Sequence, residues 1–145
     1  MPSDYFDFLI WSGDIYIRSK SVFETVLSYK QAHFDDFSLL CQDNDFIEVF
    51  TDLASVSEYV GSNKMQLRRA SAIKEKGHYK DPGFIQNLRD KHADYGLQIN
   101  FDGDGKIVPD EATCPHIFIA LLDHRLSSAF SENIYDVQDT AKVNM

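Results

Sequence analysis

The sequence is poor in cysteine and has no long apolar run. Its 145 residues include only two cysteines, Cys41 and Cys114, which are too few for the disulfide scaffold of a small secreted domain. The longest apolar run, IFIALL at 117–122, has six residues, whereas a membrane-spanning helix needs roughly 20. The N-terminus, MPSDYFDF, lacks the basic start and apolar stretch of a secretory signal. We therefore expect a cytoplasmic domain with two reduced, packed thiols.

Basic residues are also scarce. Lysine and arginine number 14 against 23 aspartates and glutamates, so the net charge is −9, which argues against binding nucleic acid through the whole surface. The exception is the stretch 61–94, here called the cationic segment, which holds eight basic and four acidic residues between two acidic stretches. Such asymmetry can mark a contact with nucleic acid or an acidic partner, although an ordinary solvated helix face gives the same pattern.

Apolar residues are plentiful enough for a core, at 43% with eleven phenylalanines. Runs of β-branched and aromatic residues predict strands at 7–10 and 14–19, joined by a turn at 12–14. Alternation of apolar and polar residues predicts a second hairpin at 97–108. The stretch 46–50, FIEVF, alternates as a strand does but could equally start a helix; we favour the strand.

Helical periodicity and end signals account for most of the remaining chain. Ser21 and Glu24 form a capping box, and Asp81-Pro82 is an N-cap followed by proline. Helices are expected at about 21–41, at 81–96 and from about Thr113 onwards, and Gly96 should end the second of these. Two shorter helices are expected within 54–76, separated by Gly61-Ser62-Asn63.

These elements predict one α+β domain over residues 1–145. A small antiparallel sheet built from hairpins would be covered on one face by four to five helices. The tail would add an edge strand through Ile134, Tyr135 and Val137. The expected core residues are Phe8, Ile10, Ile15, Ile17, Phe23, Leu27, Phe84, Leu88, Ile99, Phe101, Ile107, Phe118, Leu121 and Leu122.

Residues 100–111, NFDGDGKIVPDE, match the spacing of an EF-hand calcium loop. The residues at its ligand positions are Asn100, Asp102, Asp104 and Glu111. A helix should run directly into the first ligand, but the alternating LQINF delivers it from a strand. Pro115 would break the helix that should leave the loop. Asp-Gly between two apolar stretches is a strong hairpin signal, so we interpret this loop as a turn.

No catalytic motif stands out. Cys114, His116, Asp123 and His124 invite a zinc interpretation, but C-x-H is not a recurrent zinc spacing and no CxxC supports it. A glycine-rich phosphate loop and a G-x-S-x-G elbow are both absent from the sequence. Dispersed carboxylates leave a metal-dependent nuclease as an alternative. We expect no catalytic residue, no metal site and no cofactor.

The cationic segment is the best candidate for binding. On a helix Lys64 and Arg68 share one face, while Arg69 and Lys76 share another. If the helices at 64–76 and 81–96 pack side by side, most of the basic residues would converge on one ridge. That ridge would suit phosphate contacts without base reading. Five to eight of the segment's basic residues could take part, out of Lys64, Arg68, Arg69, Lys74, Lys76, Lys80, Arg89 and Lys91.

Four stretches in order carry a resemblance to a known family: FETVLSY, NKMQLRRASAIKEKGHYKDPGFIQNL, LQINFDGDGKI and LLDHRLSSAFSENIYDV. Over roughly residues 6–143 the chain resembles the C-terminal half of the B subunit of the bacterial Kiwa anti-phage system. The resemblance implies either the C-terminal part of a longer protein or a short stand-alone relative. It also implies DNA binding without known catalysis, self-association as a homodimer, and assembly with a membrane-embedded partner subunit. The candidate DNA-contact residues that it implies are the eight basic residues of the cationic segment.

Three functions follow as hypotheses. The leading one is a non-catalytic anti-phage domain that binds the DNA backbone, or assembles with itself and a partner subunit that could hold it at a membrane. The second is a metal-dependent nuclease. The third is a purely structural or regulatory dimerisation module.

Overall fold

The computed structural model describes residues 31–138 and 143–145. Within it, the stretch from Asp36 onwards forms one compact unit, and residues 31–35 belong to the unit before it. The strands expected at 7–10 and 14–19, the first part of the helix expected at 21–41 and the six core residues expected before residue 30 lie outside the described residues.

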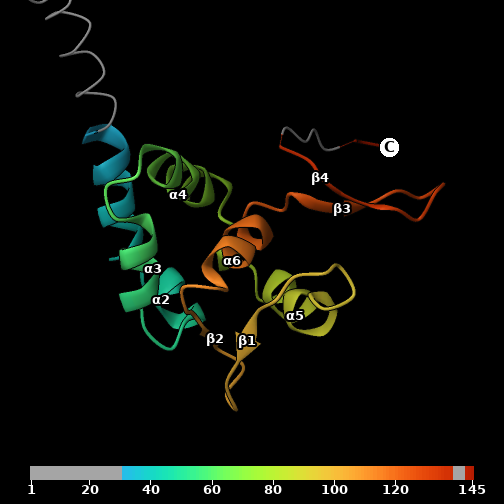
Figure 1. Cartoon of the computed structure of the whole chain (residues 1–145), viewed down its shortest axis with the longest axis horizontal. Helices are drawn as coiled ribbons and strands as arrows, with labels where there is room; N and C mark the ends of the chain where they lie inside the picture. Colours follow the sequence, from blue (N-terminus) through green and yellow to red (C-terminus); the bar gives the residue numbers. More distant parts are fainter. Residues whose placement is uncertain (1–30, 139–142) are drawn as a thin grey trace, which may run out of the picture. The chain divides into compact units, whose positions relative to one another are not determined.

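Helices are the main regular elements of the described unit, and two short hairpins accompany them (Figure 1). Residues 31–40 are helical. The elements that follow are α2 (Asn44–Val49), α3 (Ala54–Val60), α4 (Lys64–Lys76), the 3-10 helix η1 (His78–Lys80), α5 (Pro82–Lys91), β1 (Asn100–Phe101), β2 (Ile107–Val108), α6 (Cys114–Leu121), β3 (Arg125–Ser127) and β4 (Ile134–Asp136). This combination of helices with small antiparallel sheets confirms the α+β class.

The helix ends follow the sequence signals. Asn63 caps α4 by accepting a hydrogen bond from Gln66 N at 3.1 Å, and Asp81 caps α5 by accepting one from Gly83 N at 2.8 Å. The α-helix α5 ends at Lys91, and turns continue to Gly96, which has a φ of 70°.

That ending is a Schellman motif. Leu97 N donates to His92 O at 2.9 Å, and Gly96 N donates to Ala93 O at 3.0 Å. The α-helix therefore ends earlier than predicted, and Gly96 ends the turns that follow it.

Residues 46–50 are where the prediction of a strand is wrong. They lie in α2 and its C-cap, and Asp43 caps this helix by accepting a hydrogen bond from Asp45 N at 3.0 Å. Phe46, Val49 and Phe50 are all buried, which is the i, i+3, i+4 spacing of one helix face. The N-cap and this single apolar face stabilise the helix over the strand.

The two hairpins form separate sheets. β1 pairs with β2, with Phe101 opposite Ile107, and β3 pairs with β4, with Leu126 opposite Tyr135. The tail at 134–136 is thus a strand, as expected. The prediction that it adds an edge to the sheet of the 97–108 hairpin is wrong. The tail pairs instead with β3, which precedes it by a loop of six residues at 128–133.

The turn between β1 and β2 confirms the hairpin interpretation of residues 100–111. Asp102 Oδ1 accepts hydrogen bonds from Asp104 N and Lys106 N, both at 2.9 Å. Gly105 takes a φ of 81°, which a residue with a Cβ adopts only under strain. The carboxylate that would be a calcium ligand therefore stabilises its own turn.

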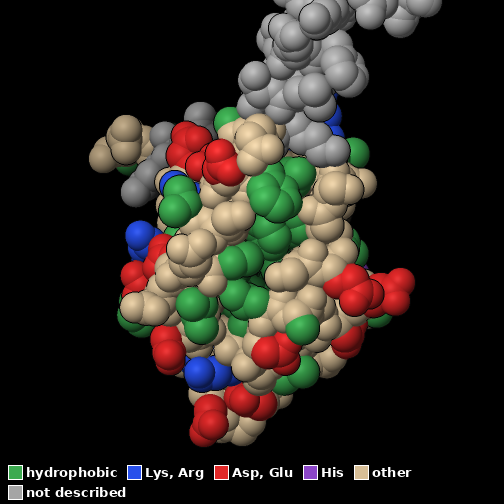
Figure 2. Space-filling view, turned by 90° about the vertical axis from the view of Figure 1, so that its left-hand side faces the viewer, with side chains coloured by type: hydrophobic (Ala, Val, Ile, Leu, Met, Phe, Trp, Pro, Cys, Tyr) green, Lys and Arg blue, Asp and Glu red, His purple; other side chains and the backbone are tan. Residues whose placement is uncertain are grey.

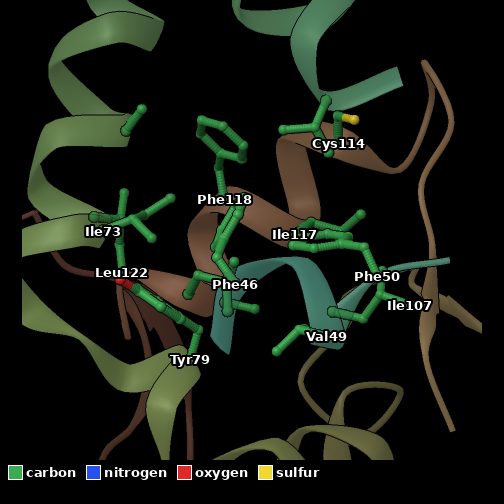
Figure 3. Packing of buried hydrophobic residues seen from close by; sticks show 14 of the residues in the cluster. Phe46, Val49, Phe50, Ile73, Tyr79, Ile107, Cys114, Ile117, Phe118 and Leu122 are labelled. Carbon is green, nitrogen blue, oxygen red and sulfur yellow. The ribbon is translucent and has the colours of Figure 1, made fainter. Parts of the chain in front are cut away.

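The core lies between α2, α4, α6 and β2. Figure 3 shows their side chains meeting in one cluster. Phe46, Phe50 and Phe118 are its largest fully buried members. Of the expected core residues in the described region, six are buried and two, Phe84 and Phe101, pack half-buried against the cluster. The six are Leu88, Ile99, Ile107, Phe118, Leu121 and Leu122.

Candidate functional site

The structure separates the two helices of the cationic segment. α4 and α5 stand apart with α6 between them (Figure 1), so their basic residues do not form the single ridge expected for helices packed side by side. Five of the eight candidate DNA-contact residues are instead engaged by other groups of the same unit. These are Arg69, Lys74, Lys76, Lys80 and Arg89.

Lys76 and Arg89 donate to backbone carbonyls that are distant in sequence. Lys76 Nζ lies 2.7 Å from Leu122 O at the C-terminal end of α6, where a cation also complements the helix dipole. Arg89 Nε lies 2.8 Å from Gly105 O and thereby joins α5 to the β1–β2 turn. Both cations therefore stabilise the packing of the unit.

Lys74 and Arg69 also have partners. Lys74 Nζ lies 3.9 Å from Asp36 Oδ1 across an exposed gap, a pair that contributes little. Arg69 lies beside Tyr59. Burial raises the pKa of Tyr59, and the Arg69 guanidinium partly offsets that rise.

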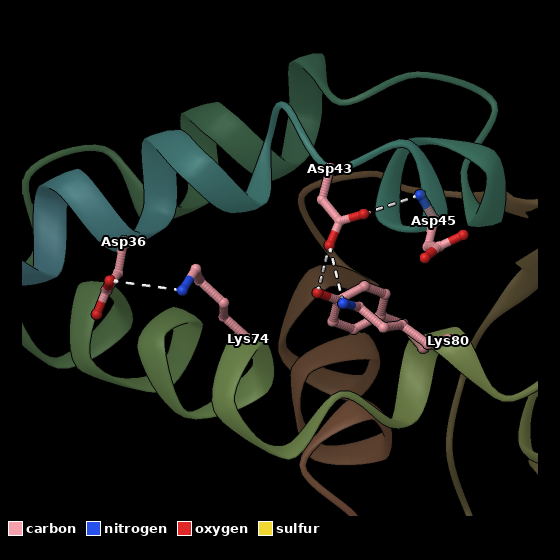
Figure 4. A network of polar contacts seen from close by, with 6 residues as sticks. Asp36, Asp43, Asp45, Lys74 and Lys80 are labelled. Atoms are coloured by element: carbon pink, nitrogen blue, oxygen red, sulfur yellow. Dashed lines mark hydrogen bonds and ion pairs between the residues drawn. The ribbon is translucent and has the colours of Figure 1, made fainter.

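Lys80 belongs to a polar network around Asp43 (Figure 4). Asp43 Oδ2 accepts a hydrogen bond from Tyr79 OH at 2.8 Å and lies 3.6 Å from Lys80 Nζ. The Tyr79 hydroxyl is the main group that lowers the pKa of Asp43, and the amide of Asp45 and the ammonium of Lys80 add to it. Burial raises the pKa of Tyr79, and the Asp43 carboxylate raises it further.

This network predicts a pH-dependent contribution to stability. Since the pKa of Asp43 is lowered by folding, its contribution is present above about pH 4 and is lost as the pH falls through the folded-state pKa. Since the pKa of Tyr79 is raised, its contribution persists to about pH 10 and is lost above that. Tyr79→Phe should cost about 1–2 kcal/mol at neutral pH. In urea denaturation, the difference between wild type and variant should shrink in acid, and a constant difference would contradict the assignment.

The three other candidate residues, Lys64, Arg68 and Lys91, are all exposed. Lys64 has an interaction within the chain. Arg68 and Lys91 form no ion pair among the residues that the structure describes. A role of the eight cations in DNA contact stays a prediction.

The residues considered for a metal are engaged in packing. Cys114 is fully buried, its Sγ lies 3.7 Å from Ser55 O, and burial raises its pKa to about 11. His116 Nδ1 accepts a hydrogen bond from Gln98 N at 3.1 Å, and His124 is buried. Over 31–138 and 143–145, no group of three histidine, cysteine or acidic side chains is arranged to hold a metal ion.

A polar cavity of about 380 Å³ lies between α2, α5 and the β1–β2 turn. Its basic side chains Lys80, Arg89 and Lys106 face the acidic Asp45, Glu48 and Asp104. Each of these basic side chains has a partner. Those of Lys80 and Arg89 are given above, and Lys106 Nζ lies 3.5 Å from Glu48 Oε2. The charges of this cavity therefore balance one another.

A second cavity, of about 340 Å³, lies between α5, the end of α6 and β3; we call it the α5–β3 cavity. Phe84, Leu88, Leu97 and Leu126 provide apolar walls, and Lys91 also lines it. A cavity of this size, mostly apolar with a few charged groups, is typical of a binding site.

The β3–β4 hairpin is the feature that sequence reasoning missed. It extends away from the helices (Figure 1), and Phe130 in its loop is 99% exposed. Ile134 and Tyr135 on β4 are exposed by almost half. The signal was the stretch SSAFSEN, whose small polar residues around one phenylalanine are typical of a hairpin loop.

No helix in the described part of the chain is long and apolar enough to cross a membrane. No curated protein and no solved structure matches the sequence. A family model does match: the one described as Kiwa protein KwaB-like covers residues 3–130, which is most of the chain and confirms the resemblance drawn from the four stretches. This match supports a Kiwa-associated anti-phage defence domain, and the chain belongs to the Kiwa protein KwaB-like family.

Proposed function

We propose that this chain is a non-catalytic component of a Kiwa anti-phage complex that acts through protein contacts, assembling with itself and with a membrane-embedded partner subunit. The observation that carries the proposal is the β3–β4 hairpin, an apolar projection that the chain's own core does not use. Burying a phenylalanine side chain is worth roughly 1.5–3 kcal/mol. A fully exposed Phe130 is therefore a ready anchor for another protein.

The charge of the surface favours a protein partner over DNA. Figure 2 shows one face on which hydrophobic side chains gather in a central patch, with acidic side chains around it and few basic ones. The chain as a whole carries −9, and most of the cationic segment is engaged internally. An apolar centre with a charged rim is the usual composition of a protein interface.

The proposal is tested by the mass of the protein in solution and by capture. Sedimentation equilibrium at micromolar concentrations should give a mass above that of one chain, and the chain should co-purify with a co-expressed membrane-embedded Kiwa partner subunit. Plasmid DNA incubated with the protein and Mg²⁺ or Mn²⁺ should stay intact. A monomer that captures no partner subunit, or metal-dependent cleavage, would contradict the proposal.

Binding of the DNA backbone is the second candidate, favoured by the exposed Arg68 and Lys91, which have no ion pair in the described residues. Fluorescence anisotropy with short duplex DNA should then show affinity that falls steeply with salt. Lys64→Glu with Arg68→Glu should weaken binding and reduce the salt slope by about one per lost phosphate contact. Lys106→Glu, a single charge reversal outside the cationic segment, is the control for the effect of each reversed charge. Lys76 is a poor probe because its loss also uncaps α6.

A further inference from the structure

We infer that two copies of this chain exchange their β3–β4 hairpins, so that Phe130 of each copy fills the α5–β3 cavity of the other. This inference rests on the proposed assembly function and names the surface that performs self-association. Its elements are an exposed aromatic anchor, an apolar cavity that receives it, and a geometry that keeps the anchor out of its own cavity.

The loop that carries Phe130 is ordered by its own hydrogen bonds. Ser128 Oγ accepts from Phe130 N and Ser131 N, both at 3.2 Å, and Ser128 O accepts from Glu132 N at 3.0 Å. Ser128 N closes the loop by donating to Asn133 O at 2.9 Å. Glu132 adopts a left-handed φ of 60°, a conformation that costs a side-chain residue about 1 kcal/mol. A loop held this way presents its phenylalanine without a large loss of entropy on docking.

The base of the hairpin is fixed to the body of the unit. Arg125 Nη1 donates to Tyr95 O and Arg125 Nε to Asp136 Oδ1, both at 2.6 Å. Val137 N donates to His124 O at 2.7 Å, beyond the last paired residues. The position of the loop relative to the cavity is therefore set by these bonds.

The cavity has the size and the lining for an aromatic ring. A cavity of about 150 Å³ lined by aliphatic and aromatic side chains holds benzene. The α5–β3 cavity, of about 340 Å³, has room for a phenyl ring together with part of the loop that carries it. Phe84, Leu88 and Leu97 supply the apolar contact from one side, and Leu126 from the other.

Phe130 does not reach the cavity of its own chain. It lies in the loop beyond the wall residue Leu126, is not among the residues that line the cavity, and is 99% exposed. In the proposed dimer a two-fold axis relates the copies, so that each Phe130 occupies the other copy's cavity. Such a contact is self-complementary and closes as a dimer.

Charge supports the same pairing. Glu132 lies two residues from Phe130, and the exposed Lys91 lines the cavity. Neither side chain has an ion pair in the described part of the chain. Arg125 also lines the cavity, as does one acid, Asp123. In the exchanged dimer Glu132 of one copy approaches Lys91 of the other.

The test is sedimentation equilibrium of the wild-type chain and five variants. Phe130→Ala should weaken self-association at least about 30-fold, as expected for an aromatic hot spot. Glu132→Lys and Lys91→Glu should each weaken it about 10-fold, and the double variant should recover to within about threefold of wild type. Met65→Ala removes an exposed apolar side chain of α4 instead and should change nothing. At concentrations where wild type is monomeric, thermal unfolding should be unchanged by Phe130→Ala, because Phe130 is 99% exposed in its own unit.

Three results would overturn the exchange. If wild type and Phe130→Ala associate equally, the assembly function stands but another surface performs it. If wild type is a monomer that captures the membrane subunit, and Phe130→Ala abolishes capture, the cavity or the anchor serves that subunit instead. If wild type is a monomer and captures nothing, both the exchange and the proposed function fail. A loss of association in both single charge variants without recovery in the double variant would also count against the pairing of Glu132 with Lys91.

Discussion

Replacing Phe46 by alanine is expected to lower the free energy of unfolding by about 3–5 kcal/mol. The Phe46 ring is fully buried, and its centroid lies 4.9 Å from that of Phe50 and 5.3 Å from that of Tyr79. Both pairs have tilted or edge-on geometry, which adds to the free energy of burial. Removing the ring leaves a cavity between α2 and η1 that a tightly packed core cannot close. Since domains of this size have a total stability of only 5–15 kcal/mol, the variant should lose much of it.

The measurement is urea denaturation of wild type, Phe46→Ala and Ile47→Ala. Ile47 is the next residue of the same helix but is 38% exposed, so its truncation should cost no more than about 0.5 kcal/mol. The slope against urea should be the same for all three proteins, because the surface exposed on unfolding is nearly unchanged. Equal losses at both positions would mean that α2 does not bury the face described here.

The contrast between these neighbours shows what the sequence did and did not reveal. A strand over 46–50 would place Phe46 and Phe50 on one face, and Ile47 and Val49 on the other. A helix groups Phe46 with Val49 and Phe50, as observed. Five residues are too short to distinguish the two periods, because both templates put Phe46 and Phe50 together. The N-cap Asp43 supplied the deciding signal, and it lies outside the apolar run.

Local signals predicted best where the backbone alone decides the structure. The caps at Asn63 and Asp81, the stop at Gly96 and the turn around Asp102 all depend on hydrogen bonds between residues close in sequence. Such bonds can be read from residue type and spacing. The separation of the helices at 61–63 follows from the same kind of signal.

The partners of the cations could not be predicted in this way. Lys76 and Arg89 donate to carbonyl oxygens that lie 46 and 16 residues away in sequence. Every residue has a carbonyl, so no residue type marks the acceptor. A cluster of basic residues in sequence therefore cannot be distinguished from a ridge in space until the packing is known.

The anchor and its cavity were hidden for a related reason. Phe130 reads in sequence as one more apolar residue of a tail, and its exposure follows only from the pairing of β3 with β4. The cavity is assembled from α5, which precedes the β1–β2 hairpin in the chain, and from α6 and β3, which follow it. The exposed apolar side chain is informative because an apolar group that stays in contact with water adds nothing to the stability of the fold.

Replacing Gly105 by alanine is expected to lower the free energy of unfolding by about 2–3 kcal/mol. Gly105 has a φ of 81°, and an alanine there costs roughly 1 kcal/mol or more in backbone strain. Its Cβ would also lie 2.7 Å from Arg89 Nε, so the guanidinium must move. That movement breaks the hydrogen bond from Arg89 Nε to Gly105 O. A hydrogen bond from a charged donor contributes about 1.5–3 kcal/mol to stability, and this one contributes no more than that because it is partly exposed.

Gly103, two residues earlier in the same turn, is the matched control. A Cβ there meets nothing within 4 Å, and its backbone is not left-handed, so Gly103→Ala should stay within about 0.5 kcal/mol of wild type. Combining Gly105→Ala with Arg89→Ala separates the two causes. In the Arg89→Ala background, Gly105→Ala should cost only the backbone strain of roughly 1 kcal/mol. The cost of Gly105→Ala in wild type minus its cost in that background is the coupling energy between the turn and α5. Because α5 forms one wall of the α5–β3 cavity, a turn that holds Arg89 also holds the helix that would receive Phe130. If instead both glycines tolerated alanine equally, the turn would not restrain α5, and the cavity would have to be maintained by its apolar walls alone.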